Sequence, residues 1–170
     1  MNYKFYKASK KDIPLIWVLI QDAIELRKKD GSNQWQDGYP NEEVIKNDIK
    51  NGIGYVLLDG SKIIGYVAIL YNDEPAYKEI KGKWLTNNEF MVLHRIAISK
   101  NYLGTGMAQK IMLLCEKLAT ENQVYSIKID TNFDNLPMLK LLEKLDYIYC
   151  GEVTFRGSHR RAYEKILSLN

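Results

Sequence analysis

The spacing of apolar residues along the chain changes between two periods, and the two periods predict helices and strands. Helical spacing runs through 9–30, 41–49 and 111–118, and a further helix is expected after Asn135. Strand-like runs are expected at 3–8, 52–58, 62–71, 90–99, 125–130, 147–155 and 159–167. The predicted order is therefore strand, two helices, three strands, helix, strand, helix and two strands.

Local signals mark several boundaries of these elements. Ser9 precedes the first helix, with an acidic residue three positions later and a proline two positions after that. Asn41 is a suitable N-cap for the second helix. The dipeptide Asp59-Gly60 predicts a hairpin turn, and 156–158 predicts another. Segment 72–88 is rich in polar residues and is expected to be a loop.

The composition is that of a globular chain with 170 residues, 46% hydrophobic and 26% charged. We expect one domain over residues 1–170, because this length can bury a sizeable core. The net charge of +3 is too small and scattered to indicate nucleic-acid binding. Cys115 and Cys150 lack the spacing of a disulfide framework or a zinc site. No apolar run has membrane-spanning length and no signal segment is recognised, so we expect a cytoplasmic protein.

The most informative stretch, 96–109, is a short apolar strand, a loop with two glycines and an amphipathic helix. The first turn of a helix has unpaired N–H donors, and glycines let an anion approach the backbone. The stretch therefore favours a pyrophosphate site, although a loop that only joins strand to helix remains the alternative. A P-loop is excluded by its missing Gly-Lys pair, and Gln109 stands where a dinucleotide fingerprint needs a glycine.

Two linked motifs carry a resemblance to a known family. Asn101-x-x-Gly104-x-Gly106 resembles the acyl-CoA loop of the GNAT superfamily of N-acetyltransferases, with Asn101 in place of the usual Gln or Arg. Downstream, 135–147 resembles the family stretch Asn-x-x-Ala-x-x-Leu-Tyr-x-Lys-x-Gly-Phe. The matching positions are Asn135, Leu141 and Lys144, Tyr147 stands for Phe, and the departures are Met138, Leu142 and Asp146.

The resemblance implies an α/β fold with a mixed, mostly antiparallel central sheet flanked by helices. In it, two parallel strands, here 90–99 and 125–130, diverge and hold CoA. The main chain of Ile96, Ala97 and Ile98 would pair with the pantetheine arm, which Asn135 and Met138 would also contact. The backbone that would hold the pyrophosphate belongs to Leu103, Gly104, Thr105, Gly106, Met107 and Ala108.

His94 is the candidate general base, because it stands two residues before Ile96 on the same predicted strand face and an imidazole titrates near neutral pH. A structural, half-buried histidine beside Arg95 is the alternative. Glu89 is a second candidate, acting through water. The family's tyrosine that protonates the departing thiolate aligns with Leu142, which has no proton to give.

The acceptor is expected to contact the linker 34–40 between the first two helices. Trp35 and Tyr39 could offer aromatic faces to an amine, while Trp35 could equally pack onto the core. Asp130, at the end of its strand, could hold an ammonium or cap the following loop.

The sequence therefore predicts an N-acetyltransferase that uses acetyl-CoA and the primary amine of a small molecule or peptide. A non-catalytic acyl-CoA sensor on the same fold is the alternative. No metal, nucleic acid or membrane is expected to take part, and a homodimer is left open.

Overall fold

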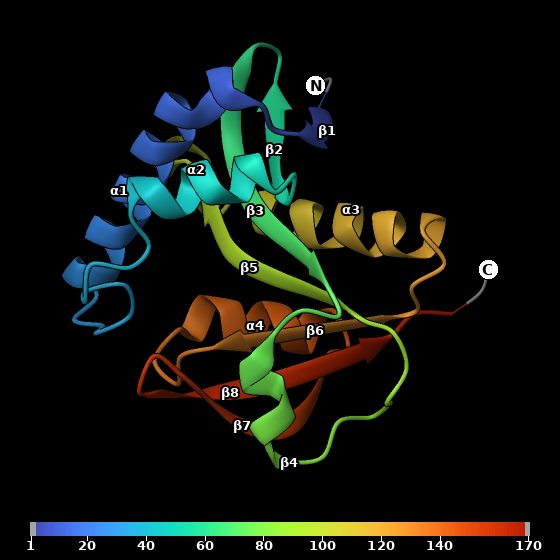
Figure 1. Cartoon of the computed structure of the whole chain (residues 1–170). Coiled ribbons are helices and arrows are strands. Elements are labelled where there is room, and N and C mark those ends of the chain that lie inside the picture. The colour runs from blue at the N-terminus through green and yellow to red at the C-terminus, as the bar shows by residue number, and fades with distance from the viewer. Residues whose placement is uncertain (1–2, 169–170) are drawn as a thin grey trace. The chain divides into compact units, whose positions relative to one another are not determined.

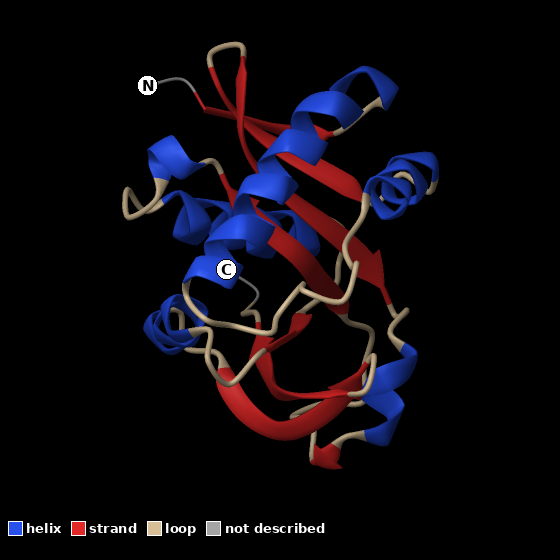
Figure 2. Cartoon of the chain, turned by 90° about the vertical axis from the view of Figure 1, so that its left-hand side faces the viewer, coloured by secondary structure: helices blue, strands red, loops and turns tan. Residues whose placement is uncertain are grey.

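The computed structural model describes residues 3–168. Its α-helices are α1 (Ile13–Lys29), α2 (Glu42–Lys50), α3 (Met107–Glu121) and α4 (Leu136–Lys144), and its 3-10 helices are η1 (Lys10–Asp12), η2 (Pro75–Glu79) and η3 (Lys100–Tyr102) (Figures 1 and 2). Its strands are β1 (Tyr3–Lys7), β2 (Gly54–Asp59), β3 (Lys62–Tyr71), β4 (Lys81–Gly82), β5 (Met91–Ile98), β6 (Ser126–Thr131), β7 (Ile148–Phe155) and β8 (Ser158–Ile166).

The strands form a mixed sheet in the order β1-β2-β3-β5-β6-β8-β7-β4. The pair β5–β6 is parallel, while β1–β2, β2–β3, β6–β8, β7–β8 and β4–β7 are antiparallel. The predicted fold class, a mostly antiparallel sheet with one parallel pair and flanking helices, is confirmed. The parallel ladder is short: it joins Met91 to Ile127 and Val92 to Lys128.

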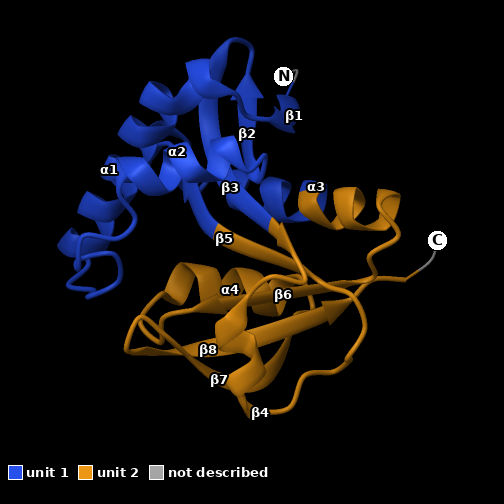
Figure 3. Ribbon diagram, in the orientation of Figure 1, with its two compact units in different colours: residues 1–69, 95–114 blue, residues 70–94, 115–170 orange. Residues whose placement is uncertain are grey.

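The chain divides into two compact units, coloured separately in Figure 3. Unit 1 comprises 1–69 and 95–114, and unit 2 comprises 70–94 and 115–170. The chain passes from one unit to the other inside β3, β5 and α3, so three regular elements contribute to both. The single domain expected over 1–170 stays a prediction.

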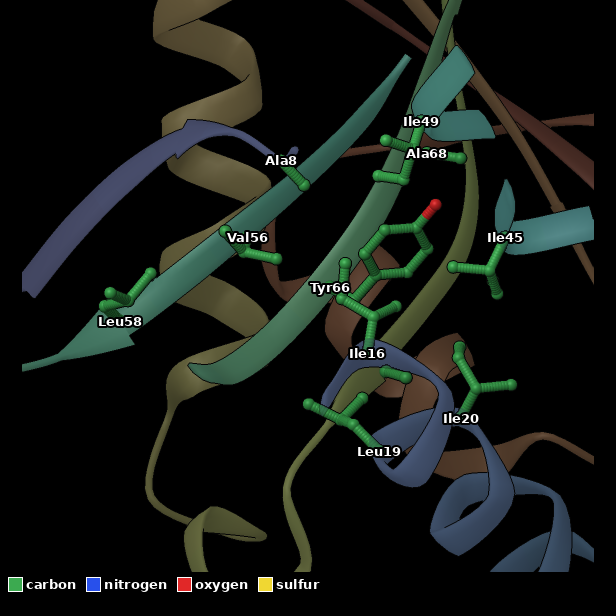
Figure 4. Packing of buried hydrophobic residues seen from close by; sticks show 11 residues of the cluster. Ala8, Ile16, Leu19, Ile20, Ile45, Ile49, Val56, Leu58, Tyr66 and Ala68 are labelled. Atoms are coloured by element: carbon green, nitrogen blue, oxygen red, sulfur yellow. The ribbon is translucent and has the colours of Figure 1, made fainter. Parts of the chain in front are cut away.

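In unit 1, α1 and α2 pack on one face of β2, β3 and β5. The buried cluster is Ala8, Ile16, Leu19, Ile20, Ile45, Ile49, Val56, Leu58, Tyr66, Ala68 and Ala97 (Figure 4). The start of η1, which leads directly into α1, is fixed by Ser9, whose N–H and hydroxyl both donate to Asp12 Oδ2 at 2.8 Å. On the other face a Cβ added at Gly65 would lie 2.6 Å from Ile111 Cδ1, so this strand position needs glycine for α3 to approach.

In unit 2, all six residues of β6 are buried, and its two faces differ in polarity. Ser126, Lys128 and Asp130 alternate with Ile127 and Ile129. Ser126 Oγ donates to Glu164 at 2.7 Å, and Lys128 Nζ lies 4.2 Å from the centroid of the Phe90 ring. One face of this strand is therefore a buried polar surface, which is uncommon unless each group has a partner.

Segment 72–88, predicted to be a loop, contains η2 and β4. Glu74 caps η2 by accepting a hydrogen bond from Ala76 N–H at 3.1 Å, and Pro75 occupies the first helical position. The first hairpin also differs slightly from its prediction: Asp59 pairs with Lys62, so Gly60 and Ser61 form the turn. In both segments the polar composition is compatible with more than one local backbone structure, so the short elements and the position of the turn could not be predicted from it.

Candidate active site

The glycine loop of unit 1 is open at both of its glycines. Gly104 and Gly106 have φ values of 73° and 84°, and a Cβ built at either would meet no atom within 4 Å. Residues 103–106 are exposed, and α3 begins directly after them, without an acidic residue in its first turn. The N–H groups of that turn have no helical acceptor, so they and the helix dipole are directed at open space.

The loop is held from behind by hydrogen bonds. Thr105 Oγ1 donates to the Tyr102 carbonyl at 2.6 Å, and the Tyr102 hydroxyl donates to Asp59 at 3.0 Å. Ile98 and Leu103, both predicted to contact the cofactor, line one pocket with α1. The other residues of that pocket are Asp22, Ala23, Glu25, Leu26, Lys29 and Lys100. Two of the predicted cofactor residues are therefore brought together in unit 1.

Upstream of the loop, the end of β5 departs from regular strand geometry. Arg95 has a φ of 54°, a conformation that is unfavourable for a residue with a Cβ. Side chains alternate between faces only along regular extended backbone. The alternation on which the strand-face argument relied is therefore interrupted at Arg95, and the placement of His94 beside Ile96 stays a prediction, although both residues lie on β5 as predicted. Ile96 and Ile98 are half-buried, and Ala97 is buried.

His94 belongs to a buried cluster in unit 2. Its Nε2 lies 2.7 Å from Glu74 Oε2, and its Nδ1 lies 4.0 Å from Asp130 Oδ1. The side chains of His94 and Glu74 are only 8% and 9% exposed. The ring of Phe155 lies beside the imidazole in a tilted arrangement, with ring centroids 5.8 Å apart. The cluster thus joins one titratable ring to two carboxylates in a poorly solvated environment, where proton positions are strongly determined by neighbours.

Asp130 is occupied by partners from unit 2. Its Oδ1 accepts from the Tyr77 hydroxyl at 2.8 Å, and its Oδ2 accepts from Arg160 Nη1 at 3.2 Å. The side chain is 0% exposed, so no oxygen faces solvent as an open ammonium site. Nor does it form the predicted loop cap, because its two oxygens are directed to a phenol and a guanidinium.

Tyr77 is a permanent hydrogen-bond donor to Asp130 at neutral pH. Burial first, and then the charge of Asp130 beside it, raise the pKa of Tyr77 well above its usual value. The phenol therefore keeps its proton throughout the neutral range and remains a donor to Asp130. Tyr77 comes from η2, the short helix that Glu74 caps, so one local element delivers both of these side chains.

The remaining candidates differ in their exposure and in their partners. Glu89 is exposed on the segment before β5. Trp35 is half-buried and has a φ of 63°. The Tyr39 hydroxyl accepts a hydrogen bond from Arg95 Nη1, and the guanidinium carbon lies 5.9 Å from the ring centroid. The aromatic face expected to meet a substrate cation therefore already lies near a cation of the protein.

Asn135 forms the N-cap of α4. Its Oδ1 accepts from Met138 N–H at 3.4 Å, and its Nδ2 donates to Thr131 Oγ1 at 3.1 Å. Met138 is half-buried in the first turn of the same helix. Leu142, at the position of the family's tyrosine, is 0% exposed and belongs to the core. These bonds give Asn135 a structural role as the N-cap of α4, separate from its predicted contact with the cofactor.

Sequence reasoning did not find Glu74 or the partners of Arg95. Glu74 is 20 residues from His94, inside a segment predicted to be an irregular loop, so no local periodicity connects the two. The Glu-Pro pair at 74–75 was the available signal for a helix start. Between residues 3 and 168 no cluster of three or more His, Cys, Asp or Glu side chains is arranged to hold a metal ion. No helix in that range is both long and apolar enough for a membrane crossing.

The two cysteines are expected to be unreactive in the folded protein. Burial, with a smaller contribution from Glu116, raises the pKa of Cys115, and burial followed by Glu164 raises the pKa of Cys150. Little thiolate therefore exists at neutral pH. Treatment of the native protein with Ellman's reagent should release little colour over minutes, whereas protein in guanidinium chloride should titrate both thiols. Rapid reaction of the native protein would contradict this prediction.

Comparisons with known proteins agree with this architecture. A family model described as "Acetyltransferase (GNAT) family" matches residues 20–147. A GNAT-family acetyltransferase structure from Streptococcus agalactiae 2603 is 36% identical, with a TM-score of 0.90 over 98% of this chain and 96% of that one. A GNAT-family structure from Listeria monocytogenes 4b F2365 is 21% identical, with a TM-score of 0.79 over 97% and 95%.

A third similar structure is the PaiA N-acetyltransferase from Thermoplasma acidophilum, solved in complex with coenzyme A. It is 14% identical, with a TM-score of 0.72 over 98% of this chain and 99% of that one. At their identities, the Listeria and Thermoplasma structures show a shared fold only. The comparison with curated proteins returned no match.

Proposed function

The chain belongs to the acetyltransferase (GNAT) family, and from this premise we propose that it transfers the acetyl group of acetyl-CoA directly to a primary amine of a small molecule or peptide. The observation that carries the proposal is the buried Glu74–His94 pair, with 2.7 Å between carboxylate and imidazole. A histidine paired with a carboxylate is a common arrangement for general acid–base catalysis, which favours an enzyme over a module that only binds acyl-CoA.

For the cofactor, we propose that the N–H groups of residues 103–108 bind the pyrophosphate. Their support is the open space at both glycines and the absence of an acidic residue from the first turn of α3. The main chain of Ile96, Ala97 and Ile98 would pair with the pantetheine arm as an added strand. Asn135 and Met138, at the start of α4, are proposed to contact the same arm.

For the proton, we propose that His94 acts together with Glu74. An ionised carboxylate accepts hydrogen bonds only, so Glu74 selects the tautomer with hydrogen on Nε2 and a lone pair on Nδ1. His94 takes the proton from the substrate ammonium. The amine nitrogen then attacks the thioester carbon, the carbon–sulfur bond breaks as the tetrahedral intermediate collapses, and CoA leaves as a thiolate. The new amide nitrogen gives up its remaining extra proton to solvent. Because buried Leu142 has no proton to give, the thiolate takes its proton from solvent.

Two further groups complete the proposal. Glu89 is the second candidate base, and its exposed position would require a bridging water. The linker 34–40, with Trp35 and Tyr39, is the proposed acceptor side of unit 1. Here the aromatic side chains would contact the amine or the chain that carries it.

A panel of amines tests the proposed function. Purified protein is supplied with acetyl-CoA and, in separate reactions, with spermidine, L-lysine and a short peptide that begins with alanine. Release of the CoA thiol and the mass of the product are followed together, so that hydrolysis is separated from transfer. An acetylated amine supports the proposal. Calorimetric CoA binding without transfer to any amine would favour the acyl-CoA sensor instead.

Substitution of Asn135 should separate its cap from its proposed cofactor contact. In Asn135→Asp the carboxylate still caps α4, because Asp and Asn are comparable N-caps, but it cannot donate a hydrogen bond. We expect the melting temperature of Asn135→Asp to stay near that of the wild type while its catalytic efficiency falls about tenfold. Asn135→Ala should lose both cap and donor. Wild-type efficiency in Asn135→Asp would restrict Asn135 to the cap.

A further inference from the structure

Arg95 is the centre of a polar cluster in unit 1 that also contains Asp48, Tyr66 and Tyr39. Arg95 Nε and Nη2 donate to the two oxygens of Asp48 at 2.9 and 2.7 Å, which is a bidentate ion pair. The Tyr66 hydroxyl donates to the same carboxylate at 2.7 Å. In Figure 4 the Tyr66 hydroxyl points away from α1, on the side of Ile45 and Ile49. The ionised side chains of Arg95 and Asp48 are only 8% and 6% exposed, so each depends on the other.

The third donor of the guanidinium reaches the linker 34–40. Arg95 Nη1 donates to the hydroxyl of Tyr39. The linker has its own internal bonds: Gln36 Nε2 donates to the carbonyls of Ile24 and Gln34, and Tyr39 N–H donates to Asp37. These hydrogen bonds hold the linker's own conformation and join it to α1, whereas the hydrogen bond at the Tyr39 hydroxyl joins the linker to β5.

The contact between Arg95 and Tyr39 connects the linker to the part of β5 that carries the proposed function. Arg95 directly follows His94 and directly precedes Ile96, the first residue of the proposed pantetheine-pairing segment. Its φ of 54° interrupts the regular extended backbone of β5 at this position. A non-glycine residue in this conformation is unfavourable unless its surroundings stabilise it, and the bidentate pair with Asp48 holds the side chain of Arg95 in one place.

We propose that Arg95 is a positioning residue that fixes the acceptor linker, through Tyr39, to the start of the cofactor-pairing segment and so sets the affinity for the amine. The inference rests on the proposed function, because it takes the linker as the acceptor side. Asp48 holds the guanidinium in place, and Tyr39 transmits its position to the linker. In this role Arg95 and Asp48 do not touch the reacting atoms, and the Tyr39 hydroxyl acts through Arg95 while its ring stays available to the acceptor.

Two single variants and their combination test the proposal. Tyr39→Phe keeps the ring and removes only the hydroxyl. Arg95→Lys keeps the charge beside Asp48 but loses the planar fork that reaches two partners at once. Each should raise the KM for the amine about 5- to 10-fold, while kcat and the KM for acetyl-CoA stay within about twofold. The double variant should have the same KM for the amine as Arg95→Lys alone, because both substitutions remove the same contact, the hydrogen bond from Arg95 to the Tyr39 hydroxyl.

Tyr55→Phe is the matched control, since Tyr55 lies in the same unit and its ring stacks on Phe5 rather than on the linker. Amide hydrogen exchange gives a readout that needs no amine. Exchange in 34–40 should accelerate in Tyr39→Phe and not in Tyr55→Phe, with 103–108 unchanged in both.

Several outcomes would overturn the inference. They are an unchanged amine KM in Tyr39→Phe, an equal rise in both KM values, strictly additive effects in the double variant, and unchanged exchange in 34–40. Additive effects in particular would mean that the Tyr39 hydroxyl meets the amine directly. Wild-type protein that acetylates no amine contradicts the proposed function instead, and the exchange measurement still decides whether Arg95 holds the linker.

Discussion

Replacement of His94 by alanine is expected to lower turnover of a protonated amine by about 10²–10⁴-fold, with little change in the KM for acetyl-CoA. The reason is that the substrate ammonium has no lone pair until a base removes its proton. The acidic limb of the pH–rate profile, which reports protonation of that base, should disappear. Steady-state kinetics across pH, with the amine and acetyl-CoA varied separately, measure both effects.

Companion variants separate proton transfer from packing. His94→Gln preserves a side chain that can donate to Glu74, so it should fold like the wild type and still lose turnover. Glu74→Gln removes the negative charge beside Nε2 and should cost about tenfold. His159→Gln changes the other histidine of the chain, which is exposed, and should leave the rate unchanged. If His94→Gln keeps both its rate and its acidic limb, His94 is structural and Glu89 becomes the base to test.

Gly106→Glu is expected to reduce CoA affinity by about 100-fold or more. Space for the side chain exists, because a Cβ at Gly106 meets no atom within 4 Å. The added carboxylate would lie at the proposed pyrophosphate position, where repulsion between like charges in a partly desolvated site is worth a few kcal/mol, about 1–4 at 4 Å. Isothermal titration calorimetry with CoA measures the loss.

Two controls isolate the charge from the strained backbone. Gly106→Ala imposes the same φ of 84° on a residue with a Cβ but adds no charge, so it should bind CoA more tightly than Gly106→Glu. Gly60→Glu introduces the same side chain at another glycine with positive φ and open surroundings, in the β2–β3 turn. It should bind CoA like the wild type. Normal affinity in folded Gly106→Glu would remove the loop from the cofactor site.

Most of the fold could be predicted because its signals are local. Helical spacing, the cap at Asn41 and the glycines at 104 and 106 each act within a few residues, and each is found where it was expected. The Asn41 cap, for example, is the bond from Val44 N–H to Asn41 Oδ1 at 3.1 Å.

The contents of the candidate site could be predicted only in part, because its contacts are not local. His94 pairs with Glu74, and Arg95 pairs with Asp48 at a separation of 47 residues. Neither pairing follows from periodicity, and the positive φ of Arg95 breaks the alternation on which the strand-face argument relied. The family resemblance pointed to His94, but which side chains surround it depends on the three-dimensional path of 72–90.

Because His94 and Arg95 are adjacent in β5, insertions and deletions in this strand are expected to be poorly tolerated. Each of these two neighbours enters a different buried network, one anchored by Asp130 and the other by Asp48. Deletion or insertion of a single residue in β5 would shift one side chain out of its network, and would leave either Asp48 without the Arg95 guanidinium or Glu74 without the His94 imidazole. The hairpin turn at 60–61 carries no such constraint. Relatives are therefore expected to tolerate gaps at that turn, and to keep the distance between β5 and the glycine loop fixed.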